Sequence, residues 1–144
     1  MVFKITLEIE GEHLYPDKLM PNLSNELVMI ESFNPDDTFV KKGKIERYGF
    51  GGVYLMHPKK ICYDGDNVEN YENTIVNFLK KNYQIIIENG GDELSISYEV
   101  YFSGDNFNIG LFNHKQLAAI TACNAAISFS GYQMSEEKIM ETFN

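Results

Sequence analysis

The sequence predicts an α+β fold, a single domain in which a mainly antiparallel sheet carries two or three helices packed on one face. Three observations predict it. Residues 94–132 read as strand, loop, helix and strand; residues 2–10 alternate apolar and polar side chains; and residues 68–81 carry apolar side chains at helical spacing. The chain of 144 residues has the usual size of one domain, so we expect one core.

The first strand is predicted from Val2 to Glu10. Apolar and polar side chains alternate through this stretch and Gly11 ends the pattern. Such alternation is typical of an antiparallel strand that has one face in solvent.

A short helix is expected within residues 14–24, because Pro16 suits a first helical turn and Pro21 limits the length. Residues 27–33 are apolar enough for a second extended segment. The turn sequence at residues 34–37 closes it.

Residues 39–60 are expected to contain a β-hairpin. The reason is that Gly49, Gly51 and Gly52 come just before the apolar run at residues 53–56. Glycines in such a position are typical of a tight turn.

The best helix is predicted from about Val68 to Lys81, with Asp66 or Asn67 as its N-cap. Residues 83–88 are apolar and β-branched, so they fit either a short strand or an extension of this helix. A Gly-Gly pair ends them in both interpretations.

The clearest alternation in the chain predicts a strand over residues 95–103. Asn113 then stands where it can cap a helix over residues 114–124, and residues 126–132 extend again. This order is the signature of an α+β layer.

Ser135 begins a last helical segment with acidic residues in its first turn. We therefore divide the chain into an α+β domain at residues 1–133 and a C-terminal helical tail at residues 134–144. The strand, loop and helix around Gly11 echo those around Gly104, and such a duplication would fit ferredoxin-like β-α-β units.

The apolar faces of these elements predict one continuous core. Its expected members are Phe3, Ile5, Leu7, Ile75, Phe78, Leu79, Ile96, Val100, Phe102, Leu117, Ile120, Ile127 and Phe129.

The chain carries twelve basic and twenty-one acidic residues, a net charge of −9. Such a charge argues against nucleic-acid binding, which needs phosphate neutralisation. Residues 41–60 run against this trend, with six bases and one acid. Cys62 and Cys123 have no CxxC spacing, and we find no signal peptide or long apolar run, so we expect reduced thiols, no membrane contact and a cytoplasmic protein.

No catalytic or metal-binding pattern is complete. The histidines at positions 13, 57 and 114 have no metal-ligand spacing. Residues 64–67 resemble a calcium loop, but Ile75 stands where the bidentate glutamate belongs. The glycines at residues 49–52 fail as a phosphate loop, because Tyr54 replaces the last glycine and a strand follows. We therefore predict no enzyme activity, no metal and no cofactor.

The order of these signals resembles the bacterial family catalogued as domain of unknown function 4279, over about Phe3 to Tyr132. The matching stretches are LYPDKL, IESFNPDDTFVKKGK, GLFNHKQL and AAISFSGY. Tyr54 stands where the family has Trp, and the Gly51-Gly52 pair lies outside its pattern. The resemblance implies a small α+β domain of the bacterial cytoplasm, without assigned catalytic residues and of a kind associated with immunity or defence.

The leading functional hypothesis is a non-enzymatic protein-binding domain whose acidic faces cover a basic partner, such as a toxin nuclease. The acids expected to point outward for this purpose are Glu8, Glu10, Glu99 and Asp105, with Asp92 and Glu93 nearby.

The alternative is a small-ligand or anion-binding domain that uses residues 41–60. In this segment lysines and tyrosines combine positive charge with stacking surfaces. The residues expected to bind are Lys42, Arg47, Tyr48 and Tyr54. The sequence leaves oligomeric state open.

Overall fold

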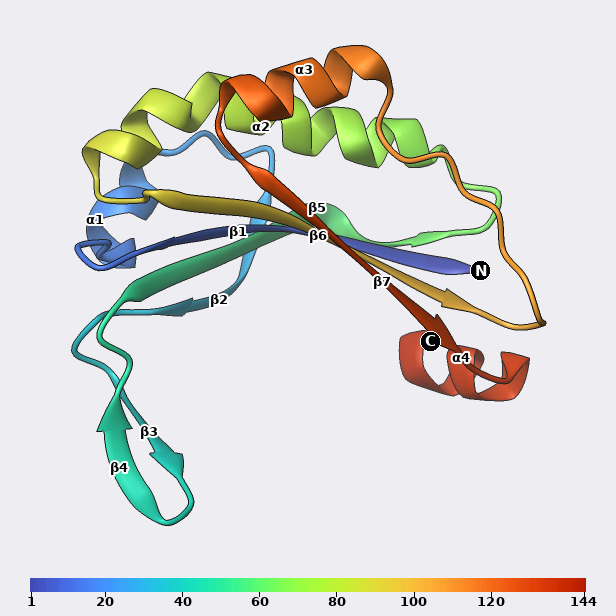
Figure 1. Ribbon diagram of the computed structural model, residues 1–144, viewed down its shortest axis with the longest axis horizontal. Coiled ribbons are helices and arrows are strands. Elements are labelled where there is room, and N and C mark those ends of the chain that lie inside the picture. The colour runs from blue at the N-terminus through green and yellow to red at the C-terminus, as the bar shows by residue number, and fades with distance from the viewer.

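The computed structural model describes residues 1–144. Its main sheet has five strands in the order β2-β5-β1-β6-β7 (Figure 1). The first three neighbouring pairs are antiparallel and the β6–β7 pair is parallel. The strands are β1 (Val2–Gly11), β2 (Val28–Phe33), β5 (Gly51–Tyr63), β6 (Glu93–Phe102) and β7 (Ala126–Gln133). The predicted α+β fold with a mainly antiparallel sheet is confirmed.

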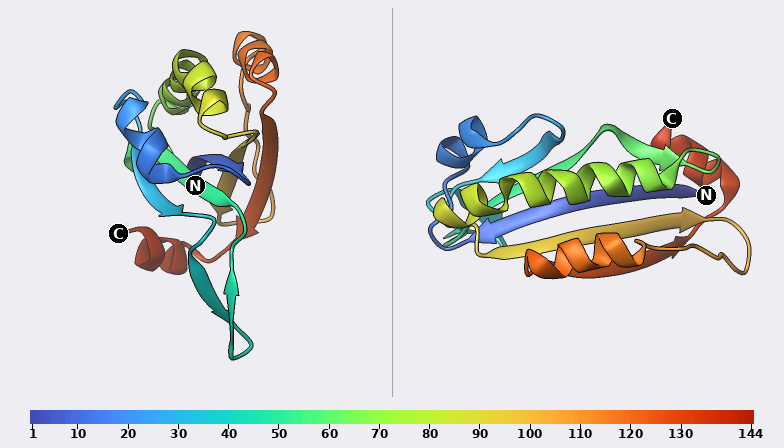
Figure 2. Two further views of the ribbon diagram at one scale, coloured as in Figure 1. Left: turned by 90° about the vertical axis from the view of Figure 1, so that its left-hand side faces the viewer. Right: turned by 90° about the horizontal axis from the view of Figure 1, so that it is seen from above.

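Helices lie on both faces of the sheet. The helices α2 and α3 cover one face, and α4 lies on the opposite face (Figures 1 and 2). None of them is long and apolar enough to span a membrane. The helical elements are α1 (Pro16–Leu19), the 3₁₀ turn η1 (Met20–Asn22), α2 (Val68–Glu88), α3 (His114–Ala122) and α4 (Glu136–Phe143).

The helix α2 runs to Glu88, so residues 83–88 extend it rather than forming a strand. Ile86 is fully buried, and this packing outweighs the β-branched character of the segment. Asn67 caps the N-terminus by accepting from the N–H of Asn70. Gly90, at φ 87°, lets the chain turn out of the helix.

The helix α3 joins the parallel strands β6 and β7 into one β-α-β unit. Asn113 is its N-cap, as predicted, and completes a capping box with Gln116. Ser135 likewise caps α4 by accepting from the N–H of Lys138.

A second sheet consists only of the hairpin formed by β3 (Thr38–Lys41) and β4 (Lys44–Arg47), which projects away from the sheet (Figures 1 and 2). A hairpin within residues 39–60 was expected, but its turn lies at Lys42-Gly43, where both residues have positive φ. The glycines at 49–52 instead lead into β5. The prediction placed the turn incorrectly because it used glycine content alone, whereas two adjacent left-handed residues close this two-residue loop.

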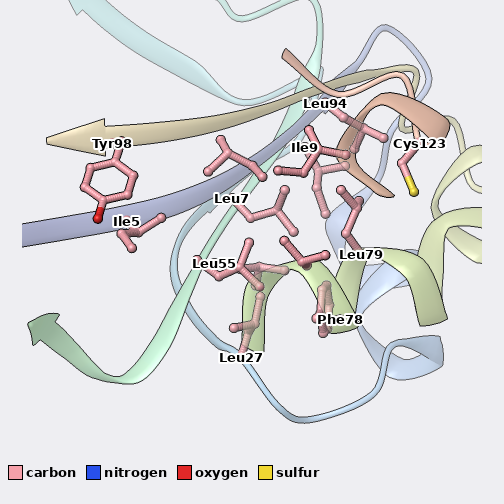
Figure 3. Close-up of a cluster of buried hydrophobic side chains, with 14 of the residues drawn as sticks. Ile5, Leu7, Ile9, Leu27, Leu55, Phe78, Leu79, Leu94, Tyr98 and Cys123 are labelled. Atoms are coloured by element: carbon pink, nitrogen blue, oxygen red, sulfur yellow. The ribbon is translucent and has the colours of Figure 1, made fainter. Parts of the chain in front are cut away.

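The core lies between the sheet and α2, and it also takes in α1 and α3 (Figure 3). Nine of the thirteen predicted core residues are buried, and Phe102 packs against them while half-buried. Three predictions are wrong, because Leu117, Ile127 and Phe129 are exposed. Ile127 and Phe129 lie on the edge strand β7, while α3 buries Gln116 and Ile120 and leaves Leu117 outside.

Candidate binding face

The sheet face opposite α2 is polar, because β1 and β6 are paired with their polar residues on that side. In this register Leu7 lies opposite Ile96 on the core side. One residue further along, Glu8 lies opposite Ser95 on the other side. We call this polar side the open face. The helix α4 and the β3–β4 hairpin lie on its side of the sheet (Figure 2).

The open face carries one attractive and one repulsive pair of charged side chains. Near one end, Lys4 lies opposite Glu99, and its Nζ is 3.5 Å from Glu99 Oε2. Near the other end, Glu10 lies directly opposite Glu93. Like charges at opposed positions of a strand pair are destabilising. The second pair therefore carries an electrostatic cost that the first pair avoids.

The Glu10–Glu93 end is hollowed into two adjoining pockets of about 340 and 430 Å³, which share Glu10, Asp92 and Glu93. No Lys, Arg or His lines either pocket. We call the five carboxylates of these pockets the acidic end: Glu8, Glu10, Glu12, Asp92 and Glu93.

Glu8 shows the effect of this crowding. Partial burial raises the pKa of its carboxyl above the ordinary value of 4.5, and repulsion from Glu10 and Glu99 acts in the same direction. The Ser95 hydroxyl opposes this change by donating a 3.2 Å hydrogen bond to Glu8 Oε2. The position of Glu8 therefore disfavours its negative charge.

The four acids expected to bind a partner do not form one group. Glu8 and Glu10 belong to the acidic end. Glu99 lies on the open face, but its carboxylate pairs with Lys4 and accepts from the Tyr101 hydroxyl. Asp105 lies in the loop after β6, beyond the end of the strand that is remote from Glu93.

Tyr54 of β5 belongs to the open face and not to the hairpin. It lies opposite Glu8 in the β1–β5 pairing, and its hydroxyl donates a 2.6 Å hydrogen bond to Glu10 Oε1. Partial burial and this bond both raise the pKa of Tyr54. Tyr54, from the basic segment at residues 41–60, is thus a neighbour of the acidic end.

Tyr48 instead packs at the base of the hairpin. Its ring stacks on Phe33 with the centroids 4.3 Å apart, and Phe39 and Phe50 complete the cluster. Lys42 lies at the exposed hairpin turn. Arg47 is 3.9 Å from Asp36, and both side chains are more than 70% exposed, so this ion pair contributes little to stability.

Other titratable side chains are dispersed. His57 packs on Tyr71 with ring centroids 4.2 Å apart, whereas His13 and His114 lie elsewhere in the chain. No three His, Cys, Asp or Glu side chains are grouped so that they could hold a metal ion. Burial raises the pKa of both Cys62 and Cys123, which suppresses thiolate formation.

Sequence reasoning missed how the acidic end assembles. Asp92 and Glu93 were expected near Glu99, yet the register places Glu93 against Glu10. Glu12 was not considered, although it follows β1 directly. The usable signals were the acids at the end of the first strand and the Asp92-Glu93 pair at the start of the later one, and they do not specify register.

Comparison of the chain with protein-family models, with curated proteins and with solved structures gives no match.

Proposed function

We propose that the protein is a non-enzymatic binding domain whose acidic end receives a cationic segment of a basic protein partner. The observation that carries the proposal is the Glu10–Glu93 pair. Two carboxylates directly opposed, with three more beside them and no base among the pocket residues, raise the energy of the unbound chain. A Lys or Arg side chain from a partner relieves this repulsion.

The electrostatics of the whole chain favour the same kind of partner. With a net charge of −9, the protein attracts cations over distances comparable to a Debye length, about 8–10 Å at moderate salt. Raising the salt concentration therefore slows association. A toxin nuclease with a basic nucleic-acid-binding surface is the partner class that this charge suits, consistent with an immunity role.

The alternative site in residues 41–60 has weaker support. Its aromatic rings are already in use, since Tyr48 stacks on Phe33 and Tyr54 donates to Glu10. Three of its lysines lie on the hairpin and two, Lys59 and Lys60, lie on β5. None of the five lines any of the five main pockets.

The test uses a short arginine-rich peptide as the probe, titrated into the ¹⁵N-labelled protein and followed by NMR. We expect the largest shift changes in the amides of β1 and β6 near Glu10 and Glu93. The triple variant Glu8→Gln, Glu10→Gln, Glu93→Gln should weaken binding by about tenfold or more, because it removes several close charge contacts.

The matched control is the triple variant Asp17→Asn, Glu69→Gln, Glu88→Gln. Its three acids are exposed and lie on α1 and α2, away from the open face, and it changes the net charge by the same amount. Equal weakening by both variants would show a nonspecific charge effect and contradict the proposal. Inorganic phosphate that shifts the amides around Lys42 and Arg47 and leaves those near Glu10 and Glu93 unchanged would favour residues 41–60 instead.

A further inference from the structure

One long stretch of this acidic chain has no charge at all. The twenty residues from Gln116 to Ser135 contain no Asp, Glu, Lys, Arg or His. They form most of α3 and all of β7. Among the seven strands, β7 alone lacks a charged residue. The uncharged stretch therefore coincides with one edge of the sheet.

The outer side of this edge is unpaired. The strand β7 pairs with β6 on one side only, and no residue of β7 takes part in any backbone hydrogen bond outside the strand ladders. Seven of its eight residues are exposed, including Ile127 and Phe129 on the side of the sheet that α2 and α3 cover. An open edge of this kind is a template for pairing with another strand.

The opposite edge of the sheet is protected. There β2 carries Glu31 beside a register shift between Met29 and Glu31. A charge and a bulge are two of the devices that prevent an edge from pairing with another strand. The edge at β7 has neither device, and it also has no proline. The two edges of one sheet are thus built differently.

We propose that β7 pairs antiparallel with β7 of a second copy of this chain, which joins two five-stranded sheets into one of ten strands. An uncharged edge is compatible with a second copy of the chain. Two chains that each carry −9 repel one another, so a dimer needs a surface without charge, and residues 116–135 of α3 and β7 supply one. The helix α3 lies over β7 and supplies the exposed Leu117 (Figure 2).

The sequence of β7 is also complementary to itself. With the two-fold axis at Phe129, Ile127 of one copy lies opposite Gly131 of the other, and Ala126 lies opposite Tyr132. Phe129 then meets Phe129 of the other copy at the axis, whereas Ile127 and Tyr132 each meet a small residue. This register keeps α2 and α3 of both copies on the same side of the joined sheet. The inference is argued without the proposed function, although Ala126 at the start of β7 also lines one pocket of the acidic end.

The experiment measures the mass of the purified protein by sedimentation velocity and light scattering over a range of concentrations. We expect the mass of two 16.5 kDa chains. Phe129→Lys should raise the dimer dissociation constant by at least about tenfold, because a symmetric interface experiences the change twice. Ser128→Lys should act in the same direction while leaving every apolar side chain in place.

The matched control is Ile30→Lys on the β2 edge, where Ile30 is 38% exposed against 43% for Phe129. It should leave the dimer intact. Oxidation of a Phe129→Cys variant should link two chains, whereas the buried native thiols Cys62 and Cys123 should not. A monomer at all concentrations would overturn the inference, as would a dimer that survives both lysine variants at β7 or dissociates with Ile30→Lys.

Discussion

Glu10 and Glu93 lie directly opposite each other across β1 and β6, in the strand pair that elsewhere sets Lys4 against Glu99. Replacing one acid by a base converts a repulsive pair into an attractive one. We expect Glu93→Lys to raise the free energy of unfolding by about 0.5–1 kcal/mol and to weaken binding of the arginine-rich peptide. Urea denaturation at neutral pH and low salt measures the first effect.

Glu93→Gln serves as the control, because it removes the repulsion without adding attraction. Its gain in stability should be smaller, and high salt should reduce both gains by screening. A stability gain with unchanged peptide binding would separate the charge pair from the proposed function. A stability loss in both variants would show that the repulsion is not significant.

The hydrogen bond from Tyr54 to Glu10 fixes one carboxylate of the acidic end. Tyr54→Phe removes the donor and should lower the free energy of unfolding by about 1.5 kcal/mol, at the low end of the range for hydrogen bonds to charged groups. Tyr132→Phe is the control, because Tyr132 is exposed and its hydroxyl makes no hydrogen bond. Thermal denaturation compares the two variants. An equal loss of stability in both would contradict a stabilising hydrogen bond from Tyr54 to Glu10.

Glu72 of α2 is buried, and its Oε1 has no hydrogen-bond partner. Burial raises the pKa of Tyr98, and the nearby Glu72 carboxylate acts in the same direction. The two side chains form no hydrogen bond of regular geometry. Burial also raises the pKa of Glu72 above its ordinary value of 4.5, against the effect of the Phe112 backbone.

The Glu72 carboxyl therefore holds its proton more tightly in the folded chain than in the unfolded chain. Stability contributed by Glu72 is full below pH 4.5 and falls as the pH rises through the raised pKa of the folded state. Glu72→Gln keeps the shape and cannot ionise, so it should flatten this decline and stabilise the protein at neutral pH. Chemical denaturation of the native chain and of Glu72→Gln, from pH 4.5 to neutral pH, measures the free energy of unfolding of each. Parallel plots of this free energy against pH would contradict the prediction.

Gly51 marks a close backbone approach rather than a phosphate site. A Cβ atom at this position would clash with the carbonyl oxygen of Leu14, and neither backbone can move without disturbing the core. Gly51→Ala should therefore cost about 1–3 kcal/mol, as overpacked sites do. Gly110→Ala is the control, since a Cβ there meets nothing within 4 Å. Similar melting temperatures for the two variants would rule out the clash.

Phe78 and Phe129 test the corrected core. Phe78 is 1% exposed, so Phe78→Ala should cost about 3–5 kcal/mol in chemical denaturation. Phe129→Ala, at an edge that is open within one chain, should cost far less when measured on the monomer at high dilution. A large cost there would show that β7 is covered within a single chain.

Local pattern determined most of the fold. The alternation of residues 2–10 and 95–103 gave two central strands and their buried faces, because a period of two is a property of the strand itself. Capping chemistry likewise placed two helix starts at Asn113 and Ser135, and it narrowed a third to Asp66 or Asn67, of which the structure has Asn67. These features depend on neighbours in sequence, so one sequence was enough.

Tertiary structure decided the rest, because it depends on which strands become neighbours. Whether Ile127 and Phe129 are buried follows from the edge position of β7, and the opposition of Glu10 to Glu93 follows from a register that no local signal encodes. The side chains of the acidic end come from segments about eighty residues apart in the chain. The sequence by itself determined that the chain would be acidic and would form an α+β sheet, and pairing across that distance determined where its charges meet.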